Sequence, residues 1–120
     1  MDPTKDRGHP VDLEGFRALM REAGVEDVAD TTVAIYVEDS PKIFAEIETA
    51  VAAGDAGAVS GAAHSLKSAS GNIHAKRLFE LLQGMEALGR AGDLAGARDA
   101  IGELRAEFAA VMSYLGGARG

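Results

Sequence analysis

The stretch that decides the fold is GDAGAVSGAAHSLKSASGNIHAKRLFELLQGMEALGRAGD, residues 54–93. It begins with one Gly-Asp pair and ends with another. Glycine often follows the last residue of a helix, and aspartate is a common N-cap of the next one. Each pair therefore predicts a tight turn between two antiparallel helices. The residues between the turns predict one helix over about 56–71 and another over about 75–91.

The sequence on either side also predicts helices. On the C-terminal side, apolar residues recur at spacings of three and four as far as Leu115, which is typical of one core-facing helix. Residues 28–53 have helical apolar spacing, and Ser40-Pro41 within them either kinks one long helix or separates two. A further short helix is predicted over residues 11–23.

Together these segments predict an all-α fold: an antiparallel up-down-up-down four-helix bundle, with the short N-terminal helix packed as a lid. The composition agrees, because Trp is absent and aromatic residues make up only 5%, so that Leu, Ile, Val, Met and Ala must build the core. We expect a flexible N-terminal arm over 1–10, a bundle domain over 11–115 and a frayed tail over 116–120.

Length and charge restrict the class of protein. At 120 residues the chain is long enough for one domain with its own core. Its net charge of −7 argues against nucleic acid as a partner, which would need a basic face. The absence of Cys excludes disulfides and thiolate metal sites. No segment resembles a signal peptide or a membrane span, so we expect a cytoplasmic protein without a membrane partner.

His64 stands out on a helical wheel of residues 56–71. At about 100° per residue, it lies roughly 160° from the centre of the predicted buried face, so we expect an exposed imidazole. That buried face consists of Val59, Ala62, Ala63, Leu66, Ser70 and Ile73.

The residues that share a face with His64 are all short. They are Ser60, Gly61, Ser68 and Gly71, which we call the small-residue strip. Each glycine in a helix costs about 1 kcal/mol of stability relative to alanine. Close approach of another protein would explain why the strip nevertheless has only short side chains. The only long side chain expected beside His64 is Lys67, one turn further on.

An exposed imidazole can act as a nucleophile near pH 7, because its reference pKa is about 6.5. Attack on a phosphoryl donor gives a covalent intermediate that can be passed on, and the Lys67 ammonium can stabilise the phosphoryl oxygens. No nucleotide-binding loop is present, so partners must supply the donor and the acceptor. The alternative is that His64 is an ordinary solvated residue, which is the usual state of an exposed histidine.

Other candidate residues point to a function less clearly than His64 does. His64 and His74 are about 15 Å apart along a helix, too far for one metal ion, and His9 lies in the predicted arm, so we expect no metal site. Phe79 either packs under the N-terminal helix or belongs to an apolar patch that binds a partner. Lys76 and Arg77 are either solvated charges or steer an acidic partner.

The string AHSLKSASGNIHAKRL at residues 63–78 resembles the signature of the histidine phosphotransfer (HPt) domain family of bacterial two-component phosphorelays. The similarity extends more weakly over residues 30–115. The matching residues are Ala63, His64, Leu66 and Lys67 in the AHxLKG-type core, Ala69, Ser70 and Gly71 in the small-residue stretch, and Ile73, Ala75 and Leu78 in its continuation.

The resemblance implies a four-helix bundle that accepts a phosphoryl group on His64, with Lys67 assisting. The donor would be the aspartate of a receiver domain or a sensor (hybrid) histidine kinase, and the acceptor a response-regulator receiver domain. The chain would be a monomeric phosphoryl-group carrier with no kinase or nucleotide-binding activity and no cofactor of its own, since the receiver supplies Mg²⁺. The small-residue strip and Phe79 would contact the partner.

Two positions depart from the family. The family usually has glycine directly after the lysine, and here that position is Ser68. Its side chain narrows the space through which a partner can approach. His74 also replaces a usual glycine, and we interpret it as a packing or surface variant that affects the corner between two helices. These departures favour an alternative hypothesis, a helical adaptor that binds and inhibits a kinase or receiver domain without being phosphorylated. A purely structural dimerising bundle would leave the small-residue strip unexplained.

Overall fold

The computed structural model describes residues 9–119, and the side chains of residues 9–116. All regular structure in this range is helical. The helices are α2 (Leu13–Glu22), α3 (Glu26–Ala53), α4 (Ala56–Asn72), α5 (Lys76–Arg90) and α6 (Leu94–Arg119). The all-α fold class is therefore confirmed.

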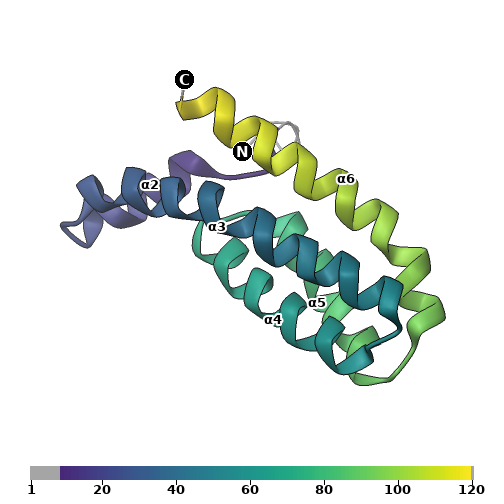
Figure 1. Cartoon of the computed structure of the whole chain (residues 1–120). Helices are drawn as coiled ribbons and strands as arrows, with labels where there is room; N and C mark the ends of the chain where they lie inside the picture. Colours follow the sequence, from purple (N-terminus) through teal and green to yellow (C-terminus); the bar gives the residue numbers. More distant parts are fainter. Residues whose placement is uncertain (1–8, 120) are drawn as a thin grey trace.

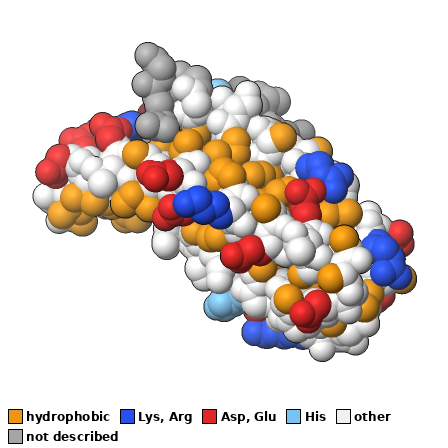
Figure 2. Space-filling model, viewed as in Figure 1, with side chains coloured by type: hydrophobic (Ala, Val, Ile, Leu, Met, Phe, Trp, Pro, Cys, Tyr) orange, Lys and Arg blue, Asp and Glu red, His pale blue; other side chains and the backbone are white. Residues whose placement is uncertain are grey.

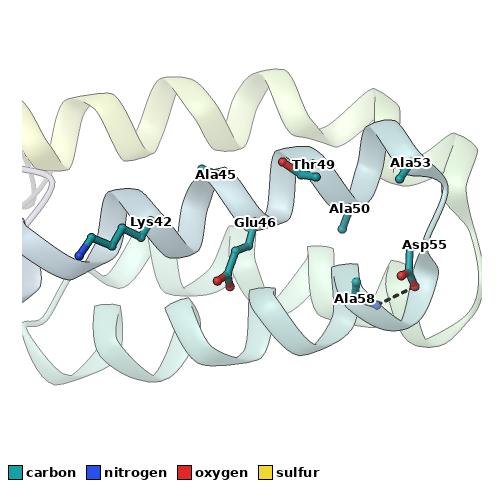
Figure 3. A pocket seen from close by; sticks show the side chains of 8 residues that line it. All are labelled: Lys42, Ala45, Glu46, Thr49, Ala50, Ala53, Asp55 and Ala58. Carbon is teal, nitrogen blue, oxygen red and sulfur yellow. Dashed lines mark hydrogen bonds between the residues drawn. The ribbon is translucent and has the colours of Figure 1, made fainter.

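The Gly-Asp turns form as predicted. Gly54 and Gly92 adopt left-handed backbone conformations, with φ of 70° and 71°. The Asp55 side chain accepts a hydrogen bond from the Ala58 backbone N–H at 3.1 Å, which Figure 3 shows as a dashed line. Asp93 accepts from the Gly96 N–H at 2.8 Å. Each turn thus ends one helix with glycine and begins the next with an aspartate cap.

Four long helices surround the core. Consecutive helices from α3 to α6 pack on one another, and α6 also packs on α3. The rings of Phe44 and Phe108 stack at 4.7 Å between α3 and α6. In Figure 1, α3 and α4 run side by side, and the start of α3 projects with α2 beyond the other helices. Aliphatic side chains fill much of the interior, among them Ile47, Leu66, Leu82, Leu104 and Leu115.

The predicted lid helix, α2, packs along α3. It also touches the corner between α4 and α5, where the Asp12 backbone N–H donates to the His74 carbonyl at 3.1 Å. The Phe16 ring meets the His74 ring edge-on at a centroid distance of 5.6 Å. Of the predicted arm, residues 1–8 lie outside the described residues, and His9 packs against Tyr114 at 5.2 Å.

The sequence left open whether Pro41 kinks one long helix or separates two. Residues 26–53 form one continuous helix with Pro41 inside it. Buried Phe44 and Ile47 on the following turns hold this segment in the core, and such packing outweighs the hydrogen bond that proline removes. At the C-terminal end, α6 continues to Arg119, past the predicted end of the bundle domain at Leu115. Gly120 lies outside the described residues.

His74 shows how the chain makes a corner without glycine. Its φ is 64°, the only positive value of a non-glycine residue in the described part of the chain. Glycine favours this left-handed region, and histidine enters it more readily than most other residues. The corner therefore keeps a backbone conformation that suits glycine while the ring packs on Phe16.

Replacing His74 tests this account of the corner. We expect His74→Val to lower the free energy of unfolding by about 2 kcal/mol, because a β-branched residue is strained at positive φ and loses the contact with Phe16. His74→Gly loses the same contact but relieves the backbone, so its stability should stay close to that of wild type. Urea denaturation followed by circular dichroism measures both. Equal stabilities of the two variants would contradict this account.

Candidate functional site

His64 lies on α4 with its ring directed away from the core. Its side chain is 56% exposed, so the exposure predicted from the helical wheel is confirmed. The Nδ1 atom is 3.0 Å from Oε2 of Glu86 on α5. Within the described residues Nε2 has no hydrogen-bond partner. The ring is thus held at one nitrogen and free at the other.

Glu86 is the buried centre of this cluster. Its side chain is only 5% exposed and also pairs with Lys67 Nζ at 2.7 Å and with an Arg90 terminal nitrogen at 2.8 Å. The hydrogen bond from Lys67, helped by that from His64, lowers the pKa of Glu86 below its ordinary value although burial opposes this. Glu86 is therefore a carboxylate at neutral pH.

The charge of Glu86 fixes the state of the imidazole. A carboxylate can only accept hydrogen bonds, so Nδ1 of His64 must donate the bond between them. In the neutral ring this leaves the lone pair on Nε2, the nitrogen without a partner in the described structure. The geometry therefore presents a nucleophilic nitrogen toward solvent.

Lys67 is less exposed than its place beside His64 suggested. Its side chain is 19% exposed and lies between Glu86 and Phe79, with Nζ 5.8 Å from the centroid of the Phe79 ring. A helical wheel describes α4 alone, so it cannot show that the long lysine side chain packs across to α5. The expectation that Lys67 is the only long side chain beside His64 is also wrong, because Arg90 reaches the same carboxylate.

The small-residue strip divides into two parts. Gly61 and Ser68 are exposed, and a Cβ at Gly61 would meet nothing within 4 Å. Ser60 and Gly71 are partly buried toward α5. A Cβ at Gly71 would come within 3.0 Å of the Phe79 ring, so Phe79 packs against α4 close to this site.

Two grooves run between α3 and α4. A groove of about 330 Å³ near the Gly54-Asp55 turn is lined by four alanines and by four polar residues, Lys42, Glu46, Thr49 and Asp55 (Figure 3). These groups form no cluster suited to chemistry, and His64 is not among its lining residues. The other groove, of about 210 Å³, is lined by Ile35, Tyr36 and Ile43 of α3 and by Ala69 and Asn72 of α4, among others.

Among the described residues, no three His, Cys, Asp or Glu side chains lie close enough together to hold a metal ion. None of the described helices is long and apolar enough to cross a membrane.

The family model described as the Hpt domain matches residues 32–114, a segment that includes His64, Lys67, Glu86 and Arg90. The chain belongs to the Hpt domain family.

A solved Hpt structure is similar over nearly the whole chain. It is the crystal structure of histidine-containing phosphotransfer protein B (HptB) from Pseudomonas aeruginosa PAO1, with 29% sequence identity and a TM-score of 0.81. The similarity covers 91% of this chain and 93% of that one. A comparison with curated protein sequences gives no match. As an Hpt domain the chain has a phosphotransfer role in a phosphorelay, where such domains partner with kinases and receiver domains.

Sequence reasoning missed two members of the cluster around His64, Glu86 and Arg90. One signal was available, since Glu86 interrupts the apolar face formed by Leu82, Met85 and Gly89 on α5. A charged residue on a core-facing side of a helix is rarely buried without a partner. Glu86 on the apolar face of α5 therefore indicates a positively charged partner on the helix that faces it.

Proposed function

We propose that this Hpt domain carries the phosphoryl group on Nε2 of His64. The observation that supports this most is the hydrogen bond at 3.0 Å between Nδ1 and the buried Glu86 carboxylate, because it leaves Nε2 as the available nucleophile. In accepting a phosphoryl group from an aspartyl phosphate, Nε2 forms the P–N bond. The P–O bond breaks, and its electron pair stays on the aspartate of the receiver.

The charges around His64 suit this transfer. The ring becomes positively charged when Nε2 is phosphorylated, and the Nδ1–H bond to Glu86 then joins a cation to a carboxylate, which strengthens it. Lys67, one turn from His64 on α4, and Arg90 on α5 both bring positive charge to the carboxylate that holds the ring. We propose that Lys67 stabilises the phosphoryl oxygens, and that the receiver partner supplies Mg²⁺.

The face around His64 also suits a receiver domain as partner. Gly61 leaves open space one turn before His64, and Asn72, further along α4, lines the 210 Å³ groove. At the edge of this groove Ile35 is 54% exposed. Figure 2 shows further hydrophobic side chains along the projecting end of the molecule, where Leu19, Val25 and Val28 are exposed. We propose that this apolar face, with the small-residue strip and Phe79, contacts the partner.

Incubation with phosphorylated receiver domains tests the proposal. We expect radiolabel to move from the receiver to this chain, as a phosphate that is labile in acid and stable in base. The alternative function, an adaptor that inhibits a kinase or receiver, predicts tight binding without transfer. Ser68 favours that alternative, because its side chain narrows the approach to His64. Ser68→Gly is the matched variant, and the carrier hypothesis predicts transfer both with and without it.

A further inference from the structure

The backbones of α4 and α5 come unusually close at Gly89. This glycine is buried, and a Cβ placed on it would lie 2.7 Å from the Ser60 backbone nitrogen and 2.9 Å from the Ala56 carbonyl oxygen. Both are backbone atoms of α4, so no side chain can move aside to make room. Ordinary contact would require the distance from the Cβ to Ser60 N to grow from 2.7 Å to at least 3.4 Å.

This close contact lies directly beside the His64 site. Gly89 follows Glu86 by one helical turn on α5, and Ser60 precedes His64 by one turn on α4. Residues three or four apart share a face of a helix. The contact between Gly89 and Ser60 and the hydrogen bond between Glu86 and His64 are therefore consecutive layers of one helix–helix interface.

We infer that Gly89 is a positioning residue, whose contact with Ser60 sets the spacing of α4 and α5 at which Glu86 holds Nδ1 of His64. The hydrogen bond is 3.0 Å long, and it would be lost beyond about 3.5 Å. Separating the helices enough for a methyl group would exceed that limit. The role of Gly89 in phosphoryl transfer rests on the proposed function, whereas its role in holding the ring does not.

The α5 helix itself provides a matched control. Gly84 lies on the same helix, and a Cβ there would meet nothing within 4 Å. Gly84→Ala should stabilise the fold through helix propensity alone. We therefore place Gly89→Ala in the Gly84→Ala background, so that the gain in helix propensity offsets part of the stability lost to the added methyl group.

The first measurement is ¹⁵N NMR of the neutral His64 ring, whose two tautomers have different nitrogen shifts. In wild type and in Gly84→Ala we expect the proton on Nδ1. In the double variant we expect a mixture of tautomers. A double variant that keeps the proton on Nδ1 would overturn the inference. This measurement is valid even if the chain carries no phosphate.

The second measurement is the rate of phosphoryl transfer from a phosphorylated receiver. Adding Gly89→Ala should slow transfer by at least about tenfold, and Gly84→Ala should change it less than about twofold. In a Glu86→Leu background, where the hydrogen bond is already absent, Gly89→Ala should have little further effect. An equal slowing in that background would show that Gly89 acts on the fold in general. If wild type shows no transfer at all, the proposed function fails, while the NMR result still decides the inference.

Discussion

A chain in which His64 is replaced by glutamine is expected to take up no phosphate from a phosphorylated receiver, while folding like the wild type. Glutamine has a similar reach but no nucleophilic nitrogen. The His64 side chain is 56% exposed, so its loss should change the free energy of unfolding by no more than about 0.5 kcal/mol. Glu86 keeps its partners Lys67 and Arg90 in this variant.

The measurement is the amount of acid-labile, base-stable phosphate on each protein after incubation with a phosphorylated receiver, with circular dichroism to follow helicity. His9→Gln is the matched control, because His9 lies against Tyr114 and is absent from the cluster around Glu86. The His9→Gln control should take up as much phosphate as the wild type does. Labelling of His64→Gln, or loss of labelling in His9→Gln, would refute the assignment of His64.

The exposure of His64 was predictable because it depends on one helix. The buried side of α4 is clear from Val59, Ala63 and Leu66, and a position nearly opposite these must face solvent whatever α4 packs against. The helix boundaries were predictable for the same reason, since the caps at Asp55 and Asp93 are local. Such features need only the sequence within about one turn.

The rest of the site depends on tertiary structure. The side chain of Glu86 meets His64 only because α4 and α5 pack in a particular register, which the periodicity of each helix separately does not determine. Lys67 is drawn toward α5 by that same carboxylate. Pro41 is another example, because packing of α3 against the core keeps the helix continuous past a residue that removes a hydrogen bond.

Replacing Glu86 should affect both phosphoryl transfer and stability. Glu86→Leu removes the acceptor for Nδ1 of His64 and frees Lys67 and Arg90, so we expect transfer to slow by about 10- to 100-fold through lost orientation of the ring. Glu86→Gln keeps an oxygen that can accept from Nδ1 and should retain more activity than Glu86→Leu. Rates of transfer from one phosphorylated receiver to the two variants measure this. Equal rates for wild type and Glu86→Leu would exclude a role of Glu86 in positioning the ring.

The pH dependence of stability separates the charge of Glu86 from its shape. Because the cations beside it lower its pKa in the folded state below the ordinary value of 4.5, its ionised form stabilises the fold fully above that value. This contribution must be lost as pH falls through the folded-state pKa. At pH 7 we expect Glu86→Gln to be less stable than wild type by about 1 to 2 kcal/mol, since hydrogen bonds to a charged group weaken.

The difference between wild type and Glu86→Gln should shrink toward zero as the pH is lowered below 4.5, because protonation turns the wild-type carboxylate into a neutral group much like the amide. Glu107, whose pKa burial raises, titrates in both proteins and cancels in this difference. Urea denaturation at a series of pH values from 7 to 3 measures it. A difference that stays constant across this range would mean that Glu86 acts through packing, and that its charge holds neither His64 nor Lys67 in place.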